Sequence, residues 1–188
     1  MSITIEKVSN KESLKKFVNF SIELYQDNEY FVPPLIYDEI ATLSASKNPA
    51  FDHCDAACFL AYRDGVIVGR IAAIINHKAN QIWNEHNARF GFVDFIDDKE
   101  VVDALFKTAE DWAKFRSMKK IQGPMGFTDF DAEGMLVEGF DYMATMQARY
   151  SYPYYKEHME RLGYEKDQDW FEYLIPVPKD IPERFIRV

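Results

Sequence analysis

The sequence predicts an α/β (α+β) fold in which a mixed, mostly antiparallel central sheet is flanked by helices. Two β-rich runs flank the dipeptide Asp64-Gly65, which favours a type I′ hairpin turn. An apolar stripe at helical spacing begins after Asp97 and Asp98 and continues to about Ser117. Strand and helix patterns alternate along the chain, and no internal repeat or linker divides it.

The N-terminal segment predicts one strand and two helices. Residues 2–8 alternate enough to form a strand, and Ser9 followed by Glu12 is the pattern of a helix-capping box. Pro33 and Pro34 break any helix, and the IYDEIATL run after them suits a short second helix. The first helix carries an apolar stripe of Leu14, Phe17, Val18, Ile22 and Tyr25.

The central segment predicts a hairpin, a strand, a helix and a short strand, in that order. The hairpin spans residues 57–75, and a polar connection at 76–87 separates it from a strand at 89–96. The long helix follows, and residues 119–127 then hold a short strand that a Gly-Pro pair stops.

The C-terminal part predicts an ordered loop, a helix and a final strand at 167–177. Pro153 suits the first turn of the helix, and Gly163 suits the left-handed residue that closes it. Three prolines, Pro176, Pro178 and Pro182, mark a tail. We expect a domain at 1–176, followed at 177–188 by a tail or by the start of a further C-terminal segment.

The composition indicates a soluble, cytoplasmic protein that does not bind nucleic acid. The chain of 188 residues has 22 Lys and Arg against 31 Asp and Glu, a net charge of −9 that repels phosphate backbones and favours a cationic substrate such as an amine. Cys54 and Cys58 are the only cysteines, which indicates a reducing compartment. No zinc-ligand spacing, signal peptide or membrane-spanning apolar run is present in the sequence.

Two segments carry a family resemblance. EHMERLGYEKDQDWFEYLIPV and FGFVDFIDDKEVVDALFKTAEDWAKFRSMKKIQGP resemble the closing helix and the central strand, helix and strand of the GNAT superfamily of acyl-CoA N-acyltransferases. FVPPLIYDEIATL, GRIAAIINHKAN and FGFVDFIDD are similar to a bacterial GNAT-like group whose members carry a further C-terminal half. The resemblance implies acetyl-CoA or another acyl-CoA as co-substrate, a small-molecule amine as acceptor, and a second GNAT-like domain or a homodimer as partner.

The resemblance also implies where the acyl-CoA pyrophosphate binds, namely on free amides where the central strand meets the long helix. The glycines usual there are absent, and Asp97 with Glu100 forms the pattern of a capping box that satisfies the same amides. An ordinary acidic helix start is therefore the competing interpretation. The cofactor-binding candidates are Ile96, Asp98, Lys99, Val101 and Val102.

Asp94 is the candidate general base, because it lies on the mostly apolar central strand. Counting back from Gly163, the position of the tyrosine acid of the family is Met159, so Tyr155 one turn earlier is the substitute. Tyr30 and Phe31 are candidates for contact with the acceptor. A solvent-facing Asp94 and core packing of the aromatic residues remain open alternatives.

Two hypotheses follow from these residues. The first is an acetyltransferase-type N-acyltransferase that moves an acyl group from acyl-CoA to an amine. The second is a non-catalytic GNAT-like binding or scaffold module with a degenerate CoA site. The turn at 96–102 distinguishes them, since free amides there favour the enzyme and side-chain capping favours the module.

Overall fold

The computed structural model describes residues 2–145, 148–181 and 185. Five strands form one sheet: β1 (Thr4–Lys7), β2 (Cys54–Arg63), β3 (Val66–Asn76), β4 (Asn87–Phe95) and β5 (Lys120–Gln122). The helices are α1 (Lys11–Leu24), α2 (Ile36–Thr42), α3 (His77–Trp83), α4 (Lys99–Phe115) and α5 (Tyr154–Leu162), with a 3₁₀ turn, η1, at Pro49–Asp52.

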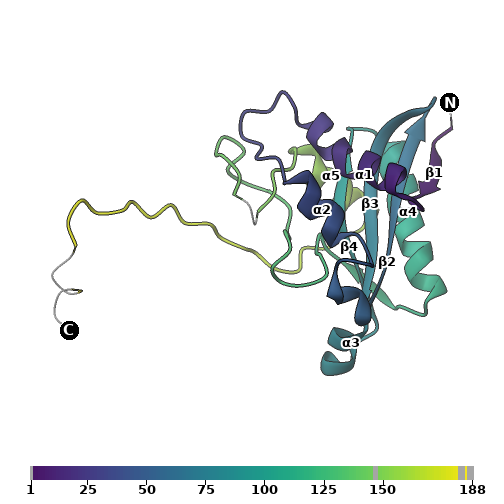
Figure 1. Ribbon diagram of the computed structural model, residues 1–188. Helices are drawn as coiled ribbons and strands as arrows, with labels where there is room; N and C mark the ends of the chain where they lie inside the picture. The colour runs from purple at the N-terminus through teal and green to yellow at the C-terminus, as the bar shows by residue number, and fades with distance from the viewer. Residues whose placement is uncertain (1, 146–147, 182–184, 186–188) are drawn as a thin grey trace.

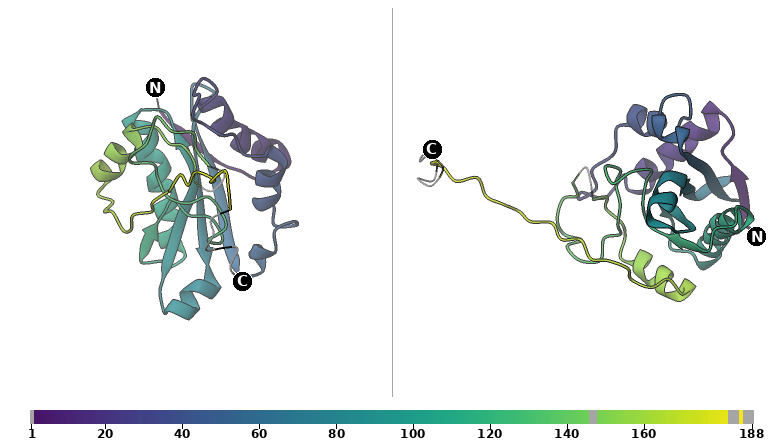
Figure 2. Two further views of the ribbon diagram at one scale, coloured as in Figure 1. Left: turned by 90° about the vertical axis from the view of Figure 1, so that its left-hand side faces the viewer. Right: turned by 90° about the horizontal axis from the view of Figure 1, so that it is seen from below.

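The sheet has the order β1-β2-β3-β4-β5 and is antiparallel except between β4 and β5. Helices α1 and α2 cover one face, while α4 and α5 pack against the other (Figures 1 and 2). Alternation along β2 supplies both cores, since Phe59 and Ala61 face α4 and Cys58 and Leu60 face α1. The predicted fold class is confirmed.

The predicted hairpin and closing helix are also confirmed. Asp64 and Gly65 have φ values of 53° and 80°, the signs that a type I′ turn requires. Helix α5 follows Pro153 and ends at Gly163, which is left-handed with a φ of 86°. Residues 128–143 form a loop without helix or strand, as expected.

Three local predictions are wrong. Asn10, not Ser9, caps α1, because its side chain accepts the Ser13 amide and Ser13 bonds back to it. The polar connection at 76–87 contains α3, which Asn76 caps. Residues 167–177 form no strand, because they extend away from the sheet without a pairing partner among the described residues (Figures 1 and 2). Part of the expected tail, including Pro182, lies outside the described residues.

Strands β4 and β5 separate after a short parallel contact, and this separation creates the site. They pair only from Asn87 to Arg89 on β4. A β-bulge then shifts the register of β4 against β3, and Phe92 takes a left-handed φ of 46° there. Two hydroxyl groups from α5 fill the open edge: that of Tyr154 donates to the Phe95 carbonyl oxygen over 2.7 Å, and that of Tyr155 accepts the Phe95 amide over 3.1 Å.

Candidate active site

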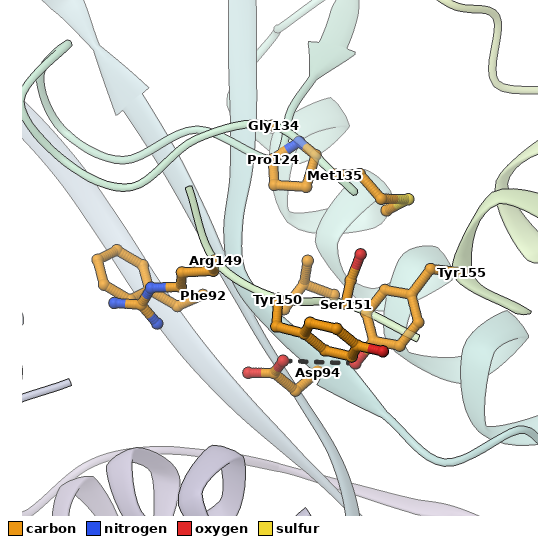
Figure 3. Close-up of a pocket in the computed structure, with 10 residues that line it drawn as sticks. Phe92, Asp94, Pro124, Gly134, Met135, Arg149, Tyr150, Ser151 and Tyr155 are labelled. Carbon is orange, nitrogen blue, oxygen red and sulfur yellow. Dashed lines mark hydrogen bonds between the residues drawn. The ribbon is translucent and has the colours of Figure 1, made fainter. Parts of the chain in front are cut away.

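A small pocket of about 40 Å³ lies where β4 and β5 separate. This volume holds about three water molecules. β4 forms its floor, and the loop that leads from β5 to α5 forms its walls (Figure 3). The pocket is lined by Phe92, Val93, Asp94, Pro124, Gly134, Met135, Arg149, Tyr150, Ser151 and Tyr155.

The pocket brings together Asp94 and Tyr155, the two residues predicted to be catalytic. The Tyr155 hydroxyl lies 3.4 Å from Asp94 Oδ1, as the dashed line in Figure 3 shows. The Tyr25 hydroxyl donates to Tyr155 over 2.8 Å. Burial raises the pKa of Tyr155 well above its ordinary value, and the nearby Asp94 carboxylate raises it further, so the phenol keeps its proton. Asp94 is buried, which contradicts a solvent-facing side chain.

Asp94 forms an ion pair with Arg70, which is fully buried on β3. Arg70 Nε donates to Asp94 Oδ2 over 2.7 Å, while Arg70 Nη1 donates to Glu39 of α2 over 2.6 Å and to the Phe17 carbonyl oxygen over 3.0 Å. Because Arg70 binds Oδ2 of Asp94, the other carboxylate oxygen, Oδ1, is left directed toward Tyr155. Arg70 thus compensates two carboxylates that the fold removes from water.

Glu39 extends the charge chain to a second pocket residue, Arg149. Arg149 Nη2 donates to Glu39 Oε2 over 2.7 Å, and its guanidinium lies 5.4 Å from the ring centre of Phe92. Burial alone raises the pKa of Glu39, but the guanidinium groups of Arg70 and Arg149 outweigh it and lower the pKa. An alternating chain of four charges therefore starts at Asp94 and ends at Arg149, and both ends line the pocket.

The predicted acyl-CoA residues lie together at the start of α4, but most of the backbone amides there already donate hydrogen bonds within the chain. Asp98 caps the helix, and its Oδ1 accepts the amides of Glu100 and Val101 over 3.0 and 3.2 Å. The Val102 amide donates to the Asp98 carbonyl oxygen, and the Ile96 amide donates to Val68. These four amides are therefore not available to a diphosphate while Asp98 holds its position.

Asp98 is fixed in turn by Arg63 at the end of β2. The guanidinium donates to both Asp98 oxygens over 2.7 and 2.9 Å, and this pairing lowers the pKa of Asp98. The predicted capping by Asp97 is wrong, because Asp97 bonds to His158 of α5 over 2.9 Å instead. Lys99 is the first residue of α4 and lines a shallow depression with Arg63.

Tyr30 and Phe31, the predicted acceptor contacts, lie beside the pocket without lining it. Phe31 stacks on Tyr25 at 4.6 Å between ring centres, and both predicted residues are partly buried against the core. Tyr25 also contacts Tyr150, which lines the pocket. Neither residue lines this cavity, and their contact with an acceptor stays a prediction.

Other candidates take no part in the pocket. Met159 is buried in the core beside α4. Cys58 is buried, and desolvation raises its pKa to about 12, so its thiol is a poor nucleophile. No group of three or more potential metal ligands exists among the described residues.

Sequence reasoning missed Arg70, Glu39, Arg149 and Tyr25. A usable signal was present for Arg70, since it is a lone charge inside the apolar run of β3. Glu39 and Arg149 gave no comparable signal, because their partners are distant in sequence and charged residues are common in such segments.

Comparison with solved structures identifies the fold. A metagenomic aminoglycoside acetyltransferase in complex with sisomicin matches with a TM-score of 0.56 and 12% identity, over 93% of this chain and 97% of the other. A tandem GNAT protein from the clavulanic acid pathway matches with a TM-score of 0.54 and 12% identity, over 86% of this chain and 43% of the other. A predicted acetyltransferase from Clostridium acetobutylicum with acetyl-CoA matches with a TM-score of 0.53 and 11% identity, over 92% and 96%. The chain therefore has the fold of the GNAT acyl-CoA N-acyltransferases.

Two curated proteins are similar in sequence. Protein YghO of Escherichia coli K12 is 39% identical over 160 residues, which are 85% of this chain and 41% of the relative. The bacterial ceramide synthase of Caulobacter vibrioides is 32% identical over 182 residues, which are 96% of this chain and 47% of the relative. The chain thus spans less than half the length of either relative. No model of a known protein family matches it, and no helix among the described residues is long and apolar enough to cross a membrane.

Proposed function

We propose that the chain transfers an acyl group from an acyl thioester, such as acetyl-CoA or a longer acyl-CoA, to the nitrogen of an amine. The observation that carries this proposal is the Asp94–Tyr155 pair at the separation of β4 and β5 in a GNAT-type fold. The ceramide synthase relative supports the reaction class, because a ceramide is an amide of a fatty acid and an amine.

Asp94 and Tyr155 divide the proton transfers between them. An alkyl amine has a pKa of about 10 and is protonated near neutral pH, so it must lose a proton before it attacks. Asp94 Oδ1 accepts that proton, and the nitrogen then forms a bond to the thioester carbon. As the C–S bond breaks, the Tyr155 hydroxyl protonates the sulfur and regains a proton from Asp94 at 3.4 Å. The second nitrogen proton leaves to water, so the products are an amide, a thiol and one proton.

The non-catalytic module remains the second candidate, and one observation favours it. Asp98 occupies amides at the start of α4 that the acyl-CoA pyrophosphate would need. In this alternative the domain binds a small molecule or a partner domain, and the buried charge network is structural.

Calorimetric titration with acetyl-CoA and a longer acyl-CoA, together with an assay for thiol release with an amine present, tests the proposal. We expect Asp94→Asn and Tyr155→Phe each to lower kcat by about 10²- to 10⁴-fold with little change in binding. Asp111→Asn is the matched control, because Asp111 is exposed and pairs only with Lys107 among its described contacts. If the chain neither binds acyl-CoA at millimolar concentration nor releases thiol, the result would favour the non-catalytic module.

A further inference from the structure

The two ends of the buried charge chain carry opposite charges, and both lie at the pocket. Asp94 lines the pocket as the negative end, and Arg149 lines it as the positive end. Figure 3 shows these two side chains at different sides of the cavity. Between them, Glu39 and Arg70 each already contact an opposite charge on both sides. A ligand in the pocket therefore meets one negative and one positive group that are separated from each other.

Arg149 carries N–H groups that the protein leaves unused. Its Nη2 donates to Glu39 over 2.7 Å, whereas its Nε and Nη1 have no hydrogen-bond partner within the described part of the chain. Glu39 is also shared, because its other carboxylate oxygen accepts from Arg70. A guanidinium with free N–H groups at a pocket wall suits a carboxylate, which it binds through two parallel hydrogen bonds.

Ser151 supplies a second donor to the same pocket. Its side chain is buried and lines the cavity, and its Oγ accepts the Leu136 amide over 3.1 Å. The hydroxyl hydrogen has no acceptor among the residues that the structure describes. A buried hydroxyl without an acceptor is costly, so a ligand oxygen is favourable here. The ionised Asp94 carboxylate offers only acceptors, which suit an ammonium group.

We propose that the pocket binds the head group of an α-amino acid, with its ammonium nitrogen at Asp94 and its carboxylate at Arg149. This inference rests on the proposed function and specifies the class of acceptor. Such a zwitterion extends the alternating chain of charges at both ends and joins the ends through its α-carbon. The pocket of about 40 Å³, with room for about three water molecules, suits a small head group. An amine without a carboxylate leaves the free N–H groups of Arg149 unpaired.

Saturation-transfer NMR of the whole chain with glycine or L-alanine, without acyl donor, tests the site directly. Glycinamide and L-alaninamide are the matched probes, because they keep the shape and the ammonium group but lack the carboxylate charge. We expect the amino acids to bind at least about tenfold more tightly than their amides, because the amides lose a charged hydrogen bond to Arg149. Equal affinity of each amino acid and its amide would overturn the proposal.

Arg149→Gln should weaken glycine binding at least about tenfold and leave glycinamide binding unchanged. Arg161→Gln is the matched control, because the Arg161 side chain is 31% exposed, against 30% for Arg149, and pairs with Asp103 outside the pocket. Circular dichroism shows whether each variant is folded. Equal weakening of glycine binding in the two variants would overturn the proposal.

Arg149→Lys provides a second test if Arg149→Gln does not fold, because it keeps a positive charge beside Glu39. An ammonium group cannot form the two parallel bonds of a guanidinium, so the preference for glycine over glycinamide should fall several-fold. An unchanged preference in Arg149→Lys would count against the carboxylate contact.

The assay for thiol release separates this inference from the proposed function. Selective binding of glycine without acyl transfer would keep the amino-acid site and overturn the enzyme. Acyl transfer to glycine and glycinamide at equal kcat/KM would keep the enzyme and overturn the amino-acid site. A carboxylate raises the pKa of the ammonium group beside it, so a preference for glycine would run against the intrinsic reactivity of the two amines.

Discussion

Arg70 holds Asp94 by one carboxylate oxygen and leaves the other directed toward Tyr155. The Nε–Oδ2 distance is 2.7 Å, and the Arg70 side chain is entirely shielded from solvent. The register of the sheet enforces this contact, because Arg70 and Asp94 are direct partners on β3 and β4 beside the bulge. The orientation of the candidate base is therefore a property of the sheet rather than of a loop.

Arg70→Met should destabilise the protein by about 3–5 kcal/mol, because it leaves Glu39 and Asp94 buried without their shared cation. Urea denaturation monitored by circular dichroism measures the change. Arg63→Met is the control, since Arg63 and its partners are partly exposed, and it should cost about 1 kcal/mol or less. A similar decrease in the free energy of unfolding in both variants would show that the buried ion pairs of Arg70 stabilise the protein no more than the partly exposed ones of Arg63.

Glu39→Gln should make the free energy of unfolding depend less on pH. Because Arg70 and Arg149 lower the pKa of folded Glu39, the unfolded chain binds its proton more readily. The stability that ionised Glu39 contributes is complete above the pKa of a glutamate in the unfolded chain, about 4.3. It is lost as the pH falls through the lower pKa of Glu39 in the folded protein. Unfolding free energies at pH 7 and pH 3 should differ less in the variant than in the native protein. Equal differences would contradict the assigned pairing.

Asp98→Ala should free the Glu100 and Val101 amides and remove one carboxylate from the turn. We expect a loss of about 1 kcal/mol in stability and a gain of about tenfold in acyl-CoA affinity. Asp98→Asn keeps a capping oxygen, so its stability should change little and its affinity gain should be smaller. Weaker acyl-CoA binding to Asp98→Ala than to the native protein would show that Asp98 does not obstruct the diphosphate.

Gly91→Ala should be severely destabilising, by more than about 3 kcal/mol, because the added methyl overlaps the backbone carbonyl of Met125. This close approach seats the loop that forms the pocket wall against β4. Gly139→Ala is the control: its methyl meets only the Tyr142 ring at ordinary distance, so the cost should be the strain of a positive φ, about 1 kcal/mol. Thermal unfolding distinguishes the two variants.

Local patterns were sufficient to predict most of the fold. Asp64-Gly65 defines a turn by its own backbone preference, and α4 shows its stripe without reference to the sheet. The strand expected at 167–177 was wrong because strand formation needs a partner, and alternation alone supplies none. Helix α3 was missed because most of its residues are polar and none of its seven residues is buried, so it shows no apolar stripe.

The site was predictable only for residues on regular elements. Asp94 could be placed because strand alternation fixes its face. The sequence predicted capping at the correct turn but assigned it to Asp97. The capping residue is its neighbour Asp98, which is held by Arg63 at the end of β2, a contact that the local sequence does not reveal. The role of Arg149 could not be deduced, because it rests on a contact with Glu39, 110 positions away.

The open edge of β4 makes α5 directly observable in solution. Because the Phe95 amide is bound by the Tyr155 hydroxyl instead of a neighbouring strand, its hydrogen exchanges with solvent when α5 lifts away. Exchange at this one amide, compared with amides in the β2–β3 hairpin, therefore reports how often the helix leaves the sheet and exposes Asp94.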